Sequence, residues 1–412
     1  MHILGTARAA AIAAVACLSA TSVAGAAPAS TPPPLPIPAA PDSTAAERPA
    51  TPETLALAAQ LAPVYVEGIE VSLSPALINE LGRQRLDALG ERAPEYRRII
   101  EESFREGFEA CKPEIERIVI HAFATRFSVG ELRAGAKFIE TPSGRNAIEA
   151  MGRSAGGAPA AEPGVAAALI HLESTSDGRG FLHGVGVNLK SYEREMVAAV
   201  VPPILSRLAD KIEISETRRA AAASAGPGAP TAESVALGVS ISHDLYGLID
   251  DKLWSKLDAI AVSSMTRSME ASTAFRPKWA AIVGSTLIEA LRQERPAVEQ
   301  AAGRALAKLY TRDELDAISE LGRSPAPAYF VTVGLAKAQG QTPAPPSPEV
   351  KASLEKFQAS GWSRTIFLKL QDKAELRKIG VEVLIALAPG WLRRIGEQTA
   401  ADEAAVEAAR GW

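Results

Sequence analysis

The chain has 412 residues, of which 47% are hydrophobic and 22% are charged, and its formal net charge is -4 at pH 7. This length favours two domains, each large enough to fold without disulfides or metals, and the charge gives no basic footprint for nucleic acid. Aromatic residues make up only 5% of the chain. Because alanine is abundant and runs of strand-forming residues are few, the composition predicts an all-α fold.

Residues 1–26 resemble a signal peptide. Arg8 precedes an apolar run over residues 9–20, and Ala24-Gly25-Ala26 supplies an A-x-A cleavage site. We therefore expect an exported protein. Cys17 leaves a second possibility open, because the residues before it weakly resemble the site where bacterial lipoproteins are cleaved and acylated. No later stretch reaches the roughly 18 uncharged apolar residues of a spanning helix, so we do not expect the mature chain to cross a membrane.

Two segments rich in Pro, Ala, Ser and Thr divide the rest of the chain. Residues 27–52 are expected to form a disordered tether, because such a composition cannot bury enough surface to fold. A similar stretch, residues 220–231, lies in a predicted linker over residues 212–232. The expected domains are therefore residues 53–211 and 233–398, followed by a C-terminal tail over residues 399–412.

The two expected domains resemble each other in sequence. A gapless alignment of residues 94–142 with residues 277–325 places Pro94, Pro113 and Pro142 opposite Pro277, Pro296 and Pro325. With small length changes it continues to the ends of both domains, where residues 203–208 meet residues 390–395. We infer two tandem copies of one multi-helix domain, joined by a Pro/Ala/Gly-rich linker.

Apolar residues at steps of three and four predict a long amphipathic helix in each copy, from Ile100 to Ala122 and from Val283 to Leu306. Pro113 and Pro296 lie inside these patterns and are expected to divide or sharply bend the helix. Cys111 lies on the apolar stripe. A buried, inert thiol is therefore favoured over a redox role for the only cysteine left after cleavage.

A capping box begins the next helix of each copy. Ser128 and Glu131 form the first, and Thr311 and Glu314 form the second. That helix is expected to end near residues 141–142 in the first copy and residues 324–325 in the second, where a hydroxyl residue followed by proline can begin another helix.

These residues carry a resemblance to a known family. Residues 127–132 (FSVGEL) and 138–145 (FIETPSGR) resemble the signature of an exported Gram-negative helical family known as domain of unknown function 2059. The resemblance is specific in the first copy and weaker in the second, where Leu321, Gly322 and Pro327 replace Phe138, Ile139 and Gly144. It implies an all-helical periplasmic or secreted protein and supplies no catalytic residue.

The residues show no set that a known chemistry requires. His121, His171, His183 and His243 are widely separated and match no H-E-x-x-H pattern. Cys111 and His121 are separated by a rise of about 15 Å along a helix. The glycine-rich residues 178–186 lack phosphate-loop spacing and are expected to form a loop between helices. The charged residues between Glu101 and Glu109 have the spacing of a solvated helix face. We therefore assign no catalytic, cofactor-binding or metal-binding residue.

Two functional classes remain open. The first is a non-catalytic binding or structural module of the cell envelope, with an apolar ligand or an envelope protein as partner. The second is a hydrolase-type enzyme whose site is assembled from scattered Glu, Arg and Ser residues. A cleft lined by carboxylates with shifted pKa values favours the enzyme, and an apolar groove in both copies favours binding.

Overall fold

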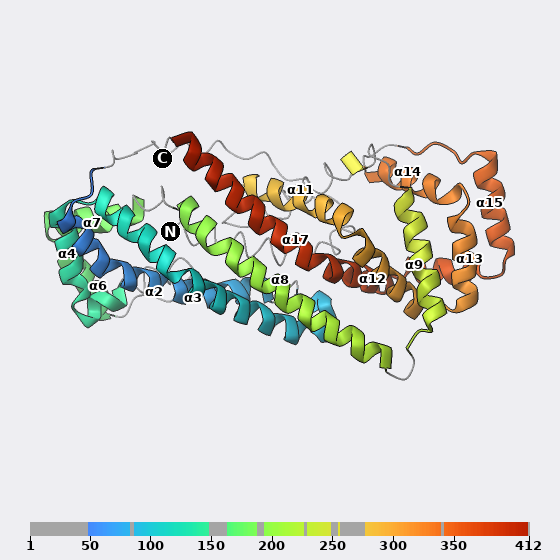
Figure 1. Cartoon of the computed structure of the whole chain (residues 1–412), viewed down its shortest axis with the longest axis horizontal. Coiled ribbons are helices and arrows are strands. Elements are labelled where there is room, and N and C mark those ends of the chain that lie inside the picture. The colour runs from blue at the N-terminus through green and yellow to red at the C-terminus, as the bar shows by residue number, and fades with distance from the viewer. Residues whose placement is uncertain are drawn as a thin grey trace.

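The computed structural model describes residues 48–82, 86–147, 163–187, 193–225, 229–248, 254–255, 277–338 and 342–410. Within these ranges the chain forms helices and no strand, which confirms the all-α class (Figure 1). The predicted signal peptide, Cys17 and most of the expected tether lie outside the described residues. We call residues 48–225 the N-terminal half and residues 229–410 the C-terminal half.

The labelled helices of the N-terminal half are α2 (Pro52–Gly82), the 3₁₀ helix η2 (Leu86–Arg92), α3 (Ala93–Arg126), α4 (Val129–Ile139), α6 (Pro163–Glu173), α7 (Ser176–Val187) and α8 (Glu193–Ala225). Those of the C-terminal half are α9 (Ala232–Gly247), α11 (Pro277–Gln293), α12 (Arg295–Leu309), α13 (Arg312–Gly322), α14 (Ala326–Ala338), α15 (Pro348–Ala359), α16 (Ser363–Gln371) and α17 (Lys373–Arg410). None of the described helices is long and apolar enough to cross a membrane.

The long helices α8 and α17 pack against each other across the middle of an elongated molecule (Figure 1). In the N-terminal half α3 packs on α8 and α2 packs on α3, while in the C-terminal half α11 and α12 pack on α17 and α9 packs on α12. The shorter helices α4, α6 and α7 lie at one end of the molecule and α13, α14 and α15 at the other (Figure 1). The end-to-end shape therefore depends on the contact between α8 and α17.

One hydrophobic core extends across both halves. It includes Ile204 and Leu208 of α8 together with Trp391 and Ile395 of α17, all of them buried. Gly396 permits the close approach, because a Cβ there would meet the Pro202 backbone at 3.2 Å. A second, smaller core around Tyr310 lies within the C-terminal half. Since apolar burial is the main favourable term in folding, the shared core joins the halves into one unit.

The structure corrects two of the expected boundaries. Residues 212–225 continue α8 as helix instead of beginning a linker, and residues 399–410 continue α17 instead of forming a tail. Ile212 and Ser215 are buried. Alanine is common in low-complexity segments and also favours helix, so the composition alone did not distinguish a linker from a helix. Packing of α8 against α3 and α17 stabilises the helical form.

Proline acts differently in the two halves. Pro113 lies inside the continuous helix α3, so of the two expected outcomes, a division or a sharp bend, the division does not occur there. Cys111 and Ile115 are buried on either side of it, and this burial offsets the cost of about 3 kcal/mol that proline imposes on a helix interior. The expected division occurs at Pro296, because α11 ends at Gln293 and α12 begins at Arg295.

Both predicted capping boxes are present. Ser128 Oγ accepts the Glu131 backbone N–H at 3.2 Å, and the Glu131 carboxylate accepts the Ser128 N–H at 2.7 Å. The same reciprocal pair joins Thr311 and Glu314, at 3.4 and 2.7 Å. Each pair satisfies backbone donors that the first turn of a helix leaves without partners.

A repeated Thr-x-x-Gly-Arg motif makes two of the corners between helices. At the corner after α4, Thr141 Oγ1 donates to Phe138 O at 2.9 Å and accepts the Gly144 N–H at 3.0 Å. At the corner between α6 and α7, Thr175 makes the corresponding bonds to Leu172 O and Gly178 N, at 3.1 and 3.0 Å. The arginine that follows each glycine donates to a backbone carbonyl of the preceding helix end.

The prediction of a loop over residues 178–186 is wrong, because these residues belong to the helix α7. A Cβ at Gly178 would lie inside contact distance of Leu172 O, and one at Gly180 would collide with the Glu131 side chain. The glycines therefore permit close packing of α7 at the corner and against α4. Their spacing reflects this packing and not a phosphate site.

Candidate functional site

A cluster of charged and hydroxyl side chains lies where α3, α8 and α17 meet. We call it the junction cluster, and its members are Arg92, Glu95, Tyr96, Ser215, Glu216, Arg219 and Glu382. Arg92 ends η2, Glu95 and Tyr96 lie in the first turn of α3, the next three share the inner side of α8, and the last comes from α17. Within it, Arg92 of the N-terminal half contacts Glu382 of the C-terminal half, and both side chains are largely shielded from water.

Arg92 joins the halves through two carboxylates. Its Nη2 lies 2.6 Å from Glu382 Oε1 in the C-terminal half, and its Nη1 lies 3.4 Å from Glu216 Oε2 in the N-terminal half. The Arg92 side chain is 13% exposed. Lys308 of α12 approaches Glu382 at 3.8 Å from another side. Because such a shielded charge is expensive to leave unpaired, Arg92 fixes the relative position of α8 and α17.

Glu216 is the centre of the cluster. It accepts a hydrogen bond from the Tyr96 hydroxyl at 3.0 Å, and Arg219 Nε lies 3.6 Å away. Burial and the neighbouring Glu216 carboxylate raise the pKa of Tyr96, so the phenol stays protonated and remains a donor. Burial lowers the pKa of Arg92, but the hydrogen bond and charge of Glu382 outweigh it and the net shift is upward. The opposite charges therefore stabilise one another.

Three residues of the classes expected for a hydrolase come together in this cluster. Ser215 Oγ donates to Glu95 Oε1 at 2.6 Å, and the other oxygen of Glu95 pairs with Arg219. The Ser215 hydrogen bond and the charge of Arg219 lower the pKa of Glu95. A carboxylate with a lowered pKa is a poorer general base, and Ser215 is buried. The geometry therefore favours a structural role for this triad.

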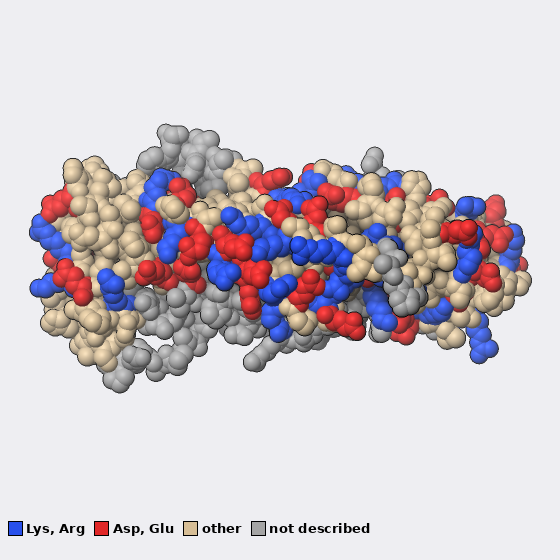
Figure 2. All heavy atoms as spheres, turned by 60° about the horizontal axis from the view of Figure 1, so that its bottom comes forward, with Lys and Arg blue, Asp and Glu red and all other residues tan. Residues whose placement is uncertain are grey.

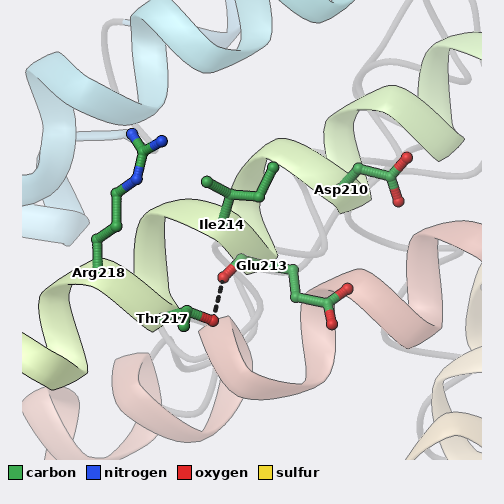
Figure 3. Close-up of a pocket in the computed structure, with 5 residues that line it drawn as sticks. All are labelled: Asp210, Glu213, Ile214, Thr217 and Arg218. Atoms are coloured by element: carbon green, nitrogen blue, oxygen red, sulfur yellow. Dashed lines mark hydrogen bonds between the residues drawn. The ribbon is translucent and has the colours of Figure 1, made fainter.

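A shallow pocket of about 480 Å³ lies on the outer side of α8 (Figure 3). The described residues that line it are Asp210, Glu213, Ile214, Thr217 and Arg218. Along the helix, Ile214 lies between Asp210 and Arg218, with its side chain directed into the space above α8 (Figure 3). Ile214 is 50% exposed, which leaves an apolar surface beside groups of both charges.

The surface around the middle of the molecule is charged but mixed. Figure 2 shows Lys and Arg side chains interspersed with Asp and Glu across the middle of this face. Lys211 of α8 contributes by binding Glu102 and Glu106 of α3 at 3.1 and 2.8 Å. These acids belong to the predicted solvated face of α3, where residues Glu101 and Glu109 are exposed. The solvated-face interpretation of that segment is confirmed.

Cys111 occupies the position expected of an inert thiol. It is buried, its Sγ donates to Phe108 O at 3.3 Å, and burial raises its pKa to about 11. A thiol is nucleophilic mainly as the thiolate, which this pKa makes rare at neutral pH. The structure therefore gives Cys111 a packing role in α3.

The four histidines outside the predicted signal peptide lie on four different helices. His171 and His183 are exposed on α6 and α7, whereas His121 lies in α3. His243 of α9 contacts Glu299 of α12, with Nδ1 3.2 Å from Oε1, and Arg295 Nε donates to the same carboxylate at 2.5 Å. Burial raises the pKa of Glu299, but these two neighbours outweigh it and lower it. Among the described residues, no three His, Cys, Asp or Glu side chains form a group that could hold a metal ion.

A second buried ion pair holds the far end of the C-terminal half. Lys369 of α16 binds the Glu314 carboxylate at 2.7 and 3.0 Å and also donates to Leu309 O at 3.0 Å. Glu314 is 2% exposed. The lysine lies 5.1 Å from the centre of the Tyr310 ring, which adds a cation–π contact. The sequence identified Glu314 as a cap, but nothing in it indicated the lysine partner, which lies three helices later in the chain.

No family model matches the chain, and no curated protein or solved structure is significantly similar to it.

Proposed function

We propose that this chain is a non-catalytic binding and structural module of the cell envelope, with its ligand or partner held on the outer side of α8. The observation that carries the proposal is the pocket at Ile214, which combines an exposed aliphatic side chain with the exposed guanidinium of Arg218 on a rigid helix. Small-molecule sites are concave, largely apolar and fitted with a few polar groups. The pocket shares one part of this pattern, an aliphatic side chain, Ile214, beside polar and charged groups.

The junction cluster supports a structural part of the proposal. Arg92 and Glu382 lie in different halves, and their contact holds α8 against α17 beside the shared core. A site built on packed helices keeps its geometry better than one built on loops. The two halves thus provide a stiff support for the pocket.

Export and family membership complete the proposal. The apolar N-terminal segment with its A-x-A site supports secretion, and the motif around residues 127–145 supports a relationship to domain of unknown function 2059. The packing partners add support for a duplication: α2 packs on α3 and α4, as α9 packs on α12 and α13. The shared core implies that any duplicated copies act as one body and not as two binders on a flexible tether.

The enzyme alternative rests on Glu95, Ser215 and Arg219. Ser215 would be the nucleophile and Glu95 the base, but the lowered pKa of Glu95 weakens this assignment. A Ser215→Ala variant separates the two functions, because it removes the hydroxyl without touching the pocket. Under our proposal it retains ligand binding.

Native mass spectrometry of the mature protein purified from its own cells tests the binding function. We expect a stoichiometric small molecule or a bound partner protein in the wild type and in Ser215→Ala alike. A chain that remains free of any ligand and partner in all fractions would contradict the proposal. Hydrolysis of an ester or amide substrate that Ser215→Ala abolishes would transfer the assignment to the enzyme.

A further inference from the structure

The chemistry of the pocket on α8 is unequal at its two ends. At one end, Arg393 of α17 binds both acids, with its Nη2 2.8 Å from Asp210 Oδ1 and 2.6 Å from Glu213 Oε2. These hydrogen bonds raise the pKa of Arg393 and hold both carboxylates beside a cation. The acidic end of the pocket is therefore already partnered by the protein itself.

The other end of the pocket carries a cation that has no partner among the described residues. Arg218 is exposed and makes no ion pair or hydrogen bond with any described residue. The neighbouring Arg219, by contrast, is bound to Glu95 inside the junction cluster. A guanidinium always carries charge and presents several donors suited to carboxylate and phosphate oxygens. Arg218 thus supplies an anion-binding group at the edge of the cavity.

Between the two ends the floor of the pocket is aliphatic. Ile214 is 50% exposed and lies one helical turn from both Asp210 and Arg218, so its side chain separates the two charged ends (Figure 3). Thr217 Oγ1 donates to Glu213 O at 2.8 Å, which uses its proton within α8. A ligand with an apolar body therefore covers Ile214 without leaving a protein donor unsatisfied.

From this arrangement we infer that the pocket binds an organic anion with a short aliphatic body, its acidic group at Arg218 and its chain over Ile214. The inference rests on the proposed binding function and names the ligand class of that same site. A cavity of about 480 Å³ has room for such a molecule. The acidic group can belong to a free amphiphile or to an anionic lipid headgroup, since both present the same oxygens.

Calorimetric titration of the full chain with decanoate, below its critical micelle concentration, tests the site. We expect one decanoate per chain and an affinity about 5- to 10-fold weaker in Arg218→Gln, as loss of a partly exposed charge-assisted bond implies. Ile214→Ser should weaken binding about 5-fold, because it removes the apolar contact. Arg98→Gln is the matched control, because the Arg98 side chain is 68% exposed on α3 and does not line the pocket, so its loss should leave the affinity unchanged.

Two further arms identify the source of the anion. Decyltrimethylammonium carries the same chain with the opposite charge and should not bind. Vesicles of phosphatidylglycerol offer the acidic group at a lipid surface: sedimentation that depends on Arg218, without binding of free decanoate, identifies a headgroup site. Binding of neither anion, or binding that Arg218→Gln leaves unchanged, overturns the inference. If native mass spectrometry still shows another bound molecule, the binding function stands and only the anion site is lost.

Discussion

The indole Nε1 of Trp391 donates a hydrogen bond to Thr286 Oγ1 at 3.1 Å and so ties α17 to α11. The sequence alignment pairs Thr286 with Ser103 and Trp391 with Ile204, which has no donor in its side chain. Ser103 is 1% exposed, and its hydroxyl has no hydrogen-bond partner within the described structure. The two aligned hydroxyls therefore differ, because one has a side-chain partner and the other has none.

Removing the two hydroxyls should have different effects. Ser103→Ala removes a buried group without a partner, so we expect the free energy of unfolding to stay the same or rise by up to about 1 kcal/mol. Thr286→Val removes an acceptor of Trp391 and should lower the free energy of unfolding by about 1 kcal/mol. Urea titration followed by circular dichroism measures both. An equal loss in the two variants would contradict the assignment of Ser103 as unsatisfied.

The helix corner at Gly144 should not accept a side chain. A Cβ there would lie inside contact distance of Phe138 O, so Gly144→Ala must open the turn that Thr141 caps. We expect a drop of several degrees in Tm. Gly322 is the matched control, because nothing lies within 4 Å of its Cβ position and it ends the helix α13. Gly322→Ala should leave Tm unchanged or raise it slightly, since alanine favours helix.

The buried pair of Glu314 and Lys369 predicts an acid-sensitive stability. Burial raises the pKa of Glu314, but Lys369 and the Thr311 N–H outweigh it, and the net shift is downward. A carboxyl whose folded pKa is depressed adds stability above its unfolded pKa, and this is lost as pH falls through the folded value. Tm should therefore decline below about pH 4.5, the ordinary range of a glutamate.

Glu314→Gln isolates this contribution, because glutamine can still fill the capping box. The variant should be less stable than the wild type at pH 7 and should show a flatter dependence of Tm on pH. Glu131→Gln provides the control in the corresponding cap of α4, where no described lysine binds the carboxylate. If both variants lose the same stability at pH 7, Lys369 adds nothing to the cap.

The contact between Arg92 and Glu382 should show measurable coupling. Both groups are largely shielded from water, so a double-mutant cycle with alanine should give a coupling energy of about 1–3 kcal/mol. The cycle of Arg393 with Glu213 serves as the exposed comparison and should give less than about 1 kcal/mol. Urea unfolding of the wild type and the variants of both cycles supplies the energies. Additive effects at Arg92 and Glu382 would show that the shared core alone joins the halves.

Local features of the fold can be predicted from the sequence, whereas partners far apart in the chain cannot. The caps at Ser128 and Thr311 depend on residues only one helical turn away, and both predictions are confirmed. The division expected at Pro113, as an alternative to a sharp bend, does not occur, because the local cost of proline is visible in the sequence and the burial on both sides of it is not. The end of α8 resembles a linker because alanine is common in low-complexity segments as well as in helices, and α17, which packs on α8, is the last helix of the chain.

The long-range contacts of the candidate site could not be predicted from the sequence either. No spacing in the sequence connects Ser215 with Glu95 or Arg92 with Glu382, since these contacts arise only when α8 meets α3 and α17. The pocket residues do follow an i, i+3, i+4 pattern on α8, from Asp210 through Ile214 to Arg218. An isoleucine flanked by charged residues on the outer face of a helix could have indicated this pocket. It was missed because residues 212–232 were predicted to form a linker.

Because the chain is made from its N-terminus, α8 is synthesised well before its packing partner α17. The α8 helix is complete at Ala225 and one of its sides packs on α3, but α17, which covers another side, begins only at Lys373. A newly made N-terminal half therefore presents the face of α8 around Pro202, which Gly396 of α17 covers in the folded chain, to its surroundings until nearly the whole chain has emerged. Chains cut short before α17 keep that surface uncovered, which makes them substrates for chaperones and proteases instead of half-sized working proteins.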